Sequence, residues 1–327
     1  MSETQNGKIG PISGGSDLSP GDAFAILGNE TRFDILRALW EASAPRGSPT
    51  AVPFSELYDR VEYGDTGNFT YHLEKLVDHF VRRTDEGYEL TAPGREIVQL
   101  MATGSNAERA NGTSTAIDVP CPSCDRSLEL AYDLPDVWLL CTTCDGCWPD
   151  RDGAVYKFTI GTGGISNRTT STVLDASIAN SLSRYEMLAN GVCPECNGTA
   201  HGSLTLCPDH DAGDGRCDSC GYSFLGTLTY ECGSCGASAC VPGWAPLLGH
   251  PALVSFEYQH GIDRSLDPWE AVSRVHGWHE ERCPDAPSKL RILVPHGRDE
   301  LRATIDETGV VDSVRHSPVP ARESKPR

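Results

Sequence analysis

The chain has 327 residues and a formal net charge of −19, with 46 acidic side chains against 27 lysines and arginines. The length is enough for two or three domains, and no apolar stretch is long enough to span a bilayer. Such an acidic balance excludes a protein that binds nucleic acid over its whole surface, so any DNA contact has to come from a local element.

Four pairs of metal-ligand residues follow one another in a single short segment, and each pair is separated by two residues. They are Cys193/Cys196, Cys207/His210, Cys217/Cys220 and Cys232/Cys235. This spacing lets two thiolates, or a thiolate and an imidazole, bind one tetrahedral zinc ion. Eight ligands make two closed sites, which are structural because no position is left for water.

Disulfides and a redox dithiol are the alternatives to zinc in this segment. Disulfides need an oxidising compartment, whereas the first ten residues, MSETQNGKIG, contain no apolar run for export. A redox dithiol is a single CxxC beside a βαβ pattern rather than a row of such pairs. We therefore expect a cytoplasmic, zinc-binding protein.

The sequence does not fix which ligand pairs share an ion, but two strand-like runs, residues 203–206 and 224–230, have the pattern of a hairpin and favour a nested arrangement. Pairing these strands brings Cys193 and Cys196 to Cys232 and Cys235 in a zinc ribbon. The inner ligands would then hold a second ion at the other end of the hairpin. Sequential pairing is the alternative, with the same ligands.

A third site is predicted upstream, where Cys121, Cys124, Cys141 and Cys144 flank strands at residues 127–132 and 137–140 with a turn between them. This order is typical of a zinc ribbon. Cys147 is either a spare buried thiol or a replacement for Cys144, and the sequence assigns no role to Cys240 or Cys283. The chain is therefore expected to hold three structural zinc ions.

The N-terminal part has helical periodicity. Helices are predicted over residues 22–27, from an Asn29 cap through Trp40, over 54–61 and, after an Asp65 cap, from Thr66 to about His79. A tight hairpin over 81–91 and a closing helix over 94–101 follow.

These elements resemble the ArsR-like winged helix-turn-helix regulators. The resemblance rests on residues 27–36, 54–57, 68–76 and 87–91. It implies that the helix from Thr66 to His79 enters the DNA major groove and that the hairpin, or wing, contacts the flanking backbone. The acidic, lysine-poor composition is similar to that of cytoplasmic proteins of halophilic archaea, and the chain from 18 to about 315 resembles a family of winged helix proteins from those organisms with zinc-binding C-terminal regions.

The candidate DNA contacts lie on that helix and the wing. Short polar side chains near a helix N-terminus can reach base edges, and basic or hydroxyl groups can bind phosphates. The predicted contacts are Asn68, Thr70, Tyr71, His72, Lys75, Arg82 and Arg83. Acidic neighbours at 65, 74 and 78 would repel phosphate, which favours a homodimer that binds double-stranded DNA through two such modules.

The fold class expected is α+β and multidomain. The predicted segments are a disordered tail (1–17), the winged helix domain (18–103), a linker (104–118), the first zinc ribbon (119–150), a connecting segment with a helix over 172–188 (151–192), the double zinc region (193–240), a small α+β domain with strands at 290–294, 300–305 and 310–314 (241–316), and a disordered tail (317–327).

The expected function is that of a sequence-specific DNA-binding transcriptional regulator. The alternative is a basal transcription factor, similar to archaeal transcription factor E, that contacts polymerase or promoter complexes. We do not expect an enzyme, because the sequence offers no paired carboxylates, nucleophile elbow or open metal site with a base, and hence no catalytic residues.

Overall fold

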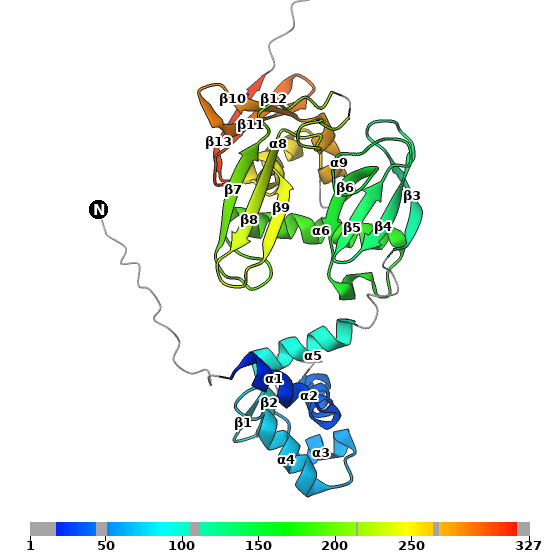
Figure 1. Ribbon diagram of the computed structural model, residues 1–327, viewed down its shortest axis with the longest axis vertical. Helices are drawn as coiled ribbons and strands as arrows, with labels where there is room; N and C mark the ends of the chain where they lie inside the picture. The colour runs from blue at the N-terminus through cyan, green and yellow to red at the C-terminus, as the bar shows by residue number, and fades with distance from the viewer. Residues whose placement is uncertain (1–17, 44–50, 105–111, 214, 264–267, 319–327) are drawn as a thin grey trace, which may run out of the picture. The chain divides into compact units, whose positions relative to one another are not determined.

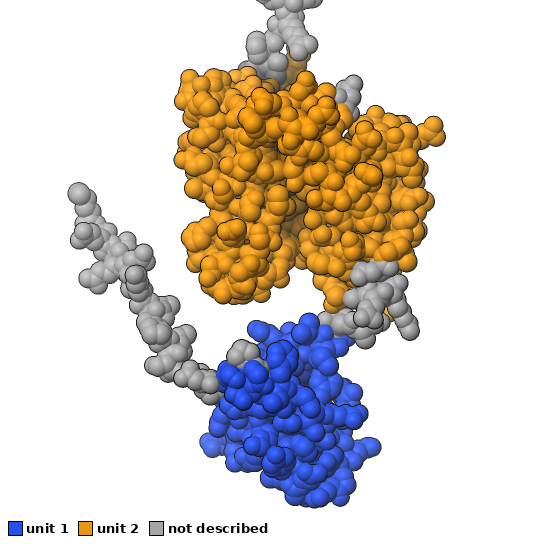
Figure 2. All heavy atoms as spheres, in the orientation of Figure 1, with its two compact units in different colours: residues 1–105 blue, residues 106–327 orange. Residues whose placement is uncertain are grey.

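A computed structural model of the chain describes residues 18–43, 51–104, 112–213, 215–263 and 268–318. They form a mixed α+β protein that divides into two compact units, residues 1–105 and 106–327 (Figures 1 and 2). The predicted tail over 1–17 and most of the tail over 317–327 lie outside the described residues. No helix within the described ranges is both long and apolar enough to cross a membrane.

The first unit is mainly helical (Figure 1). Its elements are α1 (Pro20–Leu27), α2 (Glu30–Ser43), α3 (Phe54–Val61), α4 (Thr66–Leu76), β1 (Val81–Thr84), β2 (Gly87–Leu90) and α5 (Ala92–Gly104). Both predicted caps are present: the Asn29 side chain accepts from the Arg32 N–H, and Asp65 accepts from Gly67 and Asn68. α4 ends before the predicted His79, because Asp78 takes a left-handed φ of 68° that turns the chain into β1.

The core of the first unit is built on α2 and α4. Leu36 and Leu39 from α2 and Phe69, Leu73 and Leu76 from α4 are fully buried. Periodicity of three and four residues on each helix puts these side chains on one face and leaves the other face to solvent.

The hairpin β1–β2 is fixed to this core through backbone hydrogen bonds between Val52 and Tyr88. Gly87 makes this approach possible: its φ is +143°, and a Cβ there would lie 2.2 Å from the Val52 carbonyl oxygen.

The second unit contains three antiparallel sheets (Figure 1). The first is β3 (Ser114–Pro120), β4 (Ser127–Asp133), β5 (Asp136–Leu140) and β6 (Ala154–Thr159); the second is β7 (Ala200–Leu206), β8 (Gly226–Cys232) and β9 (Ser238–Pro242); the third is β10 (His279–Cys283), β11 (Ala286–His296), β12 (Asp299–Ile305) and β13 (Val311–Pro318). Its described helices are η2 (Thr162–Ile165), α6 (Thr170–Ala189), α7 (Ala245–Leu248), α8 (Pro251–Gln259), α9 (Pro268–Ser273) and η3 (Arg274–Gly277).

Helix α6 joins the first two sheets. Its buried side chains include Val173, Leu174 and Ile178. The Thr159 N–H donates to Ser181 Oγ at 2.9 Å, and the Asn180 amide donates to the Thr159 carbonyl at 2.7 Å. These two bonds satisfy the backbone at the end of β6 and hold the helix against the sheet.

Both predicted ribbon hairpins, β4–β5 and β7–β8, are confirmed, as are the three C-terminal strands. Four strands were not predicted, one of which is β10, the edge strand that pairs with β11 in the C-terminal sheet. β3 starts inside the predicted linker, where it pairs with β4; β6 lies in the predicted connecting segment; β9 adds to the second hairpin. The segments predicted between 119 and 316 all lie within one compact unit whose buried residues form one continuous core.

Replacing Leu73 with alanine should destabilise the first unit. Leu73 is fully buried in α4, so the substitution removes apolar contacts and leaves a cavity, and about 2–5 kcal/mol of the free energy of unfolding should be lost. Urea unfolding followed by circular dichroism measures the change. Tyr71→Ala, on the exposed face of the same helix, is the control and should cost little; equal losses in both variants would contradict this account of α4.

Candidate functional site

Twelve cysteine and histidine side chains gather into three groups in the second unit. Within each group the ligand atoms lie within 4.8 Å of one another. The groups are Cys121/Cys124/Cys141/Cys144, Cys193/Cys196/Cys232/Cys235 and Cys207/His210/Cys217/Cys220. All twelve predicted ligands are thus brought together, and the last eight form the nested arrangement favoured from the strand pattern.

The distances within the groups fit a tetrahedral metal ion. The sulfurs of Cys124 and Cys141 are 3.6 Å apart, those of Cys196 and Cys232 are 3.5 Å apart, and Cys220 Sγ lies 3.5 Å from His210 Nδ1. Zinc–sulfur bonds of about 2.3 Å at tetrahedral angles place two sulfurs roughly 3.8 Å apart. Each group therefore could hold one ion such as Zn²⁺ with every coordination position filled by protein.

Four of the ligand pairs share one backbone conformation. In each, the N–H of the first cysteine donates to the carbonyl five residues later, at 2.7–2.9 Å. The residue after the second cysteine has a positive φ in all four: Asp125 (59°), Asn197 (59°), Gly221 (78°) and Gly236 (73°). Glycine, asparagine and aspartate are the residues that tolerate this conformation best. The residue type after each CxxC is therefore a second signal for these turns, and the ligand spacing alone does not use it.

Backbone N–H groups donate to sulfurs in all three groups. The amides of Cys235 and Ser234 lower the pKa of Cys232 to about 6, and those of Asp211 and Cys220 lower the pKa of Cys217 to about 7. A hydrogen bond to the charged form favours ionisation. Since the thiolate is the form that binds metal, these amides prepare the sulfurs for coordination.

The histidine of the inner group, His210, has to be neutral to bind a metal ion, whereas the cysteines have to be ionised. Burial lowers the pKa of His210, which keeps the imidazole neutral near pH 7. Its Nδ1 lies beside the Cys220 sulfur. A neutral ring with a nitrogen lone pair is what metal binding requires.

Three cysteines lie outside the groups. Cys144 rather than Cys147 is the fourth member of the first group. Cys147 is buried, and burial raises the pKa of its thiol. Cys240 is exposed, and Cys283 is buried with its sulfur 3.4 Å from an Arg291 nitrogen.

The predicted DNA contacts occupy α4 and the hairpin of the first unit. Asn68, Tyr71 and Lys75 are exposed on α4. The Asn68 amide donates to the Tyr63 hydroxyl at 2.9 Å, and the Thr70 hydroxyl donates to the Thr66 carbonyl at 2.8 Å. Asn68, Tyr71 and Lys75 therefore share a solvent-facing surface, while the Thr70 hydroxyl is used within the helix.

His72 does not belong to that surface. It is only 9% exposed and packs against Tyr63 and Tyr71, at ring distances of 6.2 and 5.4 Å. Burial, together with the charge of Arg32, lowers the pKa of its imidazole. The prediction of a DNA contact by His72 is corrected here, because the side chain follows the buried Phe69 by three positions and so faces inward.

Both arginines of β1 that are predicted to contact DNA are exposed but paired with carboxylates. Arg82 Nε donates to Glu89 at 2.7 Å, and Arg83 contacts Glu74 at 2.7 Å and lies over the Tyr88 ring. The Tyr88 hydroxyl and Glu74 raise the pKa of Arg83. A phosphate group would have to compete with these carboxylates for the guanidinium groups.

The comparisons with known proteins give two family matches. Residues 118–311 match a family described as a domain of unknown function, DUF7351, and residues 20–101 match a second domain of unknown function, DUF7347. No curated protein and no solved structure matches the chain.

Elemental analysis of the purified protein should find three zinc ions per chain. Cys217→Ser should reduce this to two, because the inner group loses a thiolate that the site needs. Cys240→Ser is the matched control, since Cys240 lies outside all three groups, and it should keep three. One ion or none in the unmodified protein would contradict the three-site account.

Proposed function

We propose that this chain, which belongs to the DUF7351 family, is a sequence-specific DNA-binding transcriptional regulator. The family model matches more than half of the sequence and has no assigned activity. In this proposal the first unit is an ArsR-like winged helix domain with α4 as its recognition helix. The second unit is held together by three structural zinc ions.

The observation that supports this proposal best is the division of α4 into two faces. Phe69, Leu73 and Leu76 are fully buried and fix the helix on the core. The opposite face presents Asn68 and Lys75 to solvent. An exposed polar face on a helix held rigidly by its other side is what base reading in the major groove requires.

Asn68 has the chemistry for base reading. It lies in the first turn of α4, and an asparagine amide can make two hydrogen bonds to an adenine edge. In the unbound protein its Nδ2 is held by the Tyr63 hydroxyl. Tyr63 therefore orients the amide before DNA binds. Hydrogen bonds from Asn68 to a base would replace the bond to Tyr63 or share the amide with it.

The wing supplies the backbone contacts in this proposal. Arg82 and Arg83 project from β1, with side chains 66% and 55% exposed. Their carboxylate partners reduce the gain from binding phosphate, because an existing ion pair has to be exchanged for a new one. A net charge of −19 adds a general repulsion. We therefore propose that affinity depends on two copies of the module acting together.

A homodimer also accounts for exposed apolar side chains in the first unit. Phe24 on α1 is 76% exposed and Met101 on α5 is 56% exposed. Large apolar groups left in solvent are typical of a surface that is covered by a partner. In this proposal α1 and α5 form the dimer interface, which leaves α4 and the wing to DNA.

Base reading by α4 should appear in a titration of DNA binding at several salt concentrations. Asn68→Ala should lose about 1–3 kcal/mol on a matched operator and much less on a scrambled one. Arg82→Ala and Arg83→Ala should weaken binding on both DNAs and reduce the salt slope by about one for each lost phosphate contact.

The matched control is Arg37→Ala, which removes an exposed, ion-paired arginine from α2. Its affinity and salt slope should equal those of the unmodified protein. Equal losses on both DNAs for Asn68→Ala would mean that α4 does not read sequence, and the proposed function would then fail.

Phe24→Asp should convert the proposed dimer to a monomer, because it places a charge in an apolar contact. Light scattering gives the mass in solution. Tyr258→Asp, at an aromatic side chain of the second unit that is 73% exposed, is the control and should leave the mass unchanged. A monomeric unmodified protein would contradict the dimer directly.

A further inference from the structure

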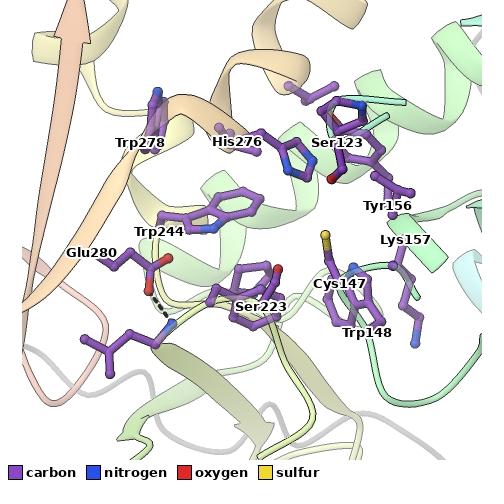
Figure 3. Close-up of a pocket in the computed structure, with 18 of the residues that line it drawn as sticks. Ser123, Cys147, Trp148, Tyr156, Lys157, Ser223, Trp244, His276, Trp278 and Glu280 are labelled. Atoms are coloured by element: carbon purple, nitrogen blue, oxygen red, sulfur yellow. Dashed lines mark hydrogen bonds between the residues drawn. The ribbon is translucent and has the colours of Figure 1, made fainter. Parts of the chain in front are cut away.

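A cavity of about 810 Å³ opens inside the second unit (Figure 3). Its wall combines the loop after the first metal group, the loop between the inner group and β8, the residues Trp244 and Leu248, and side chains between Val272 and Glu280. The volume is in the range of sites that hold small organic molecules. This cavity adjoins the metal groups, since His210 of the inner group reaches its lining.

Aromatic rings form much of the lining. Trp244 and Trp278 meet edge to face with ring centroids 6.1 Å apart, and Trp148 packs on Phe224 at 5.3 Å. Trp278 and Trp148 are buried, and Trp244 is partly buried. Figure 3 shows the Trp244 ring, the His276 ring and the Cys147 sulfur turned toward the same space.

Glu280 contributes a carboxylate to this aromatic wall. One of its oxygens, Oε2, accepts from the backbone N–H groups of Leu225 at 2.8 Å and Gly226 at 3.2 Å. Its other oxygen is turned toward the Trp244 ring (Figure 3). Burial, opposed by these two amides, raises the pKa of Glu280 to about 7. A cation beside the second oxygen would stabilise the charged form.

The remaining charges of the lining do not favour an anionic ligand. Lys157 is the one lysine or arginine among the described lining residues, and its ammonium is 3.0 Å from Asp136 and 4.9 Å from the centre of the Trp138 ring. Burial lowers the pKa of His276 to about 4, so its ring is neutral near pH 7.

The neighbouring metal groups add negative charge when they are filled. His210, a ligand residue of the inner group, and Ser123, which lies between Cys121 and Cys124 of the first group, reach the lining. A Zn²⁺ ion bound by four thiolates leaves a net charge of about −2, and one bound by three thiolates and a histidine leaves about −1. The cavity therefore combines aromatic faces with a negative potential.

We propose that this cavity binds a small organic cation, with an ammonium group between the Glu280 carboxylate and the face of Trp244 and an apolar body against the other aromatic rings. Cation–π attraction and a charge-assisted hydrogen bond both act on such a group. The proposal does not depend on DNA binding, and its test uses none.

The experiment titrates the full-length, zinc-loaded protein with three probes of similar shape: benzylamine, benzyl alcohol and benzoate. Calorimetry measures affinity, and tryptophan fluorescence reports on the site because three of the six tryptophans lie in its wall. Benzylamine should bind saturably, about ten-fold or more tightly than benzyl alcohol, since the alcohol can donate a hydrogen bond to the carboxylate but carries no positive charge to assist it. Benzoate should bind more weakly still.

Glu280→Gln should remove most of the preference for benzylamine over benzyl alcohol. The glutamine oxygen can still accept from Leu225 and Gly226, so the loop should keep its conformation. Glu281→Gln is the matched control: Glu281 is the next residue of β10 and is paired with Arg291 at 3.0 Å outside the lining. It should bind benzylamine as the unmodified protein does.

Trp244→Leu is the second variant and is decisive if Glu280→Gln loses zinc or unfolds. It keeps an apolar wall but removes the cation–π contact, so benzylamine should bind several-fold more weakly while benzyl alcohol changes little. Failure of benzylamine to bind, equal binding of the alcohol, or unchanged preference in a folded Glu280→Gln or Trp244→Leu protein would overturn the proposal. DNA binding could fail in all its tests without affecting this result.

Discussion

Crowding of sulfur atoms is the constraint on which the second unit depends. Four ligand atoms within 4.8 Å of one another cannot all be thiolates without a cation between them, because like charges at such distances repel strongly. Because of this repulsion, the pKa values of the cysteines within one group differ widely. Backbone amides lower the pKa of Cys217 to about 7, whereas burial and the neighbouring sulfurs of Cys207 and Cys217 raise that of Cys220 to about 11. A metal ion removes the conflict and turns each group into a cross-link between distant segments.

Side-chain contacts also join the inner group to the C-terminal sheet. Strand β10 holds the loop end of the β7–β8 hairpin with two side chains of opposite charge, two residues apart and hence on one face. Glu280 accepts from the amides of Leu225 and Gly226, and Arg282 donates to the carbonyl of Cys207 at 2.6 Å. The inner metal group and the C-terminal sheet thus form one body, and the cavity beside Glu280 exists because this strand and the hairpin meet there.

The sequence was sufficient for features that are encoded locally. The ligand spacing predicted all three groups, and apolar periodicity predicted the helices of the first unit to within a few residues. The sequence was insufficient where a contact between distant segments determines whether a segment forms a strand. Nothing near β3 or β9 in the sequence marks them as edge strands, since each is defined by the partner strand it finds. β6 had a local signal, with Val155, Tyr156 and Phe158 of high β propensity. The inward position of His72 was also readable from the spacing of Phe69 and Leu76 around it.

The two proposed binding activities belong to units with separate cores, so any regulation has to be a coupling between them. A cation in the second unit changes DNA affinity only if it binds one DNA-binding state of the protein more tightly than the other, and DNA then changes cation affinity by the same factor. In the proposed DNA-binding mode, such a coupling could act on the ion pairs of the β1–β2 hairpin. Arg82 and Arg83 are already engaged by Glu89 and Glu74, so modest changes in the hairpin would change how readily they exchange partners for phosphate. A weakly favourable DNA interface is the easier kind to regulate, because a coupling of only 1–3 kcal/mol changes its occupancy substantially.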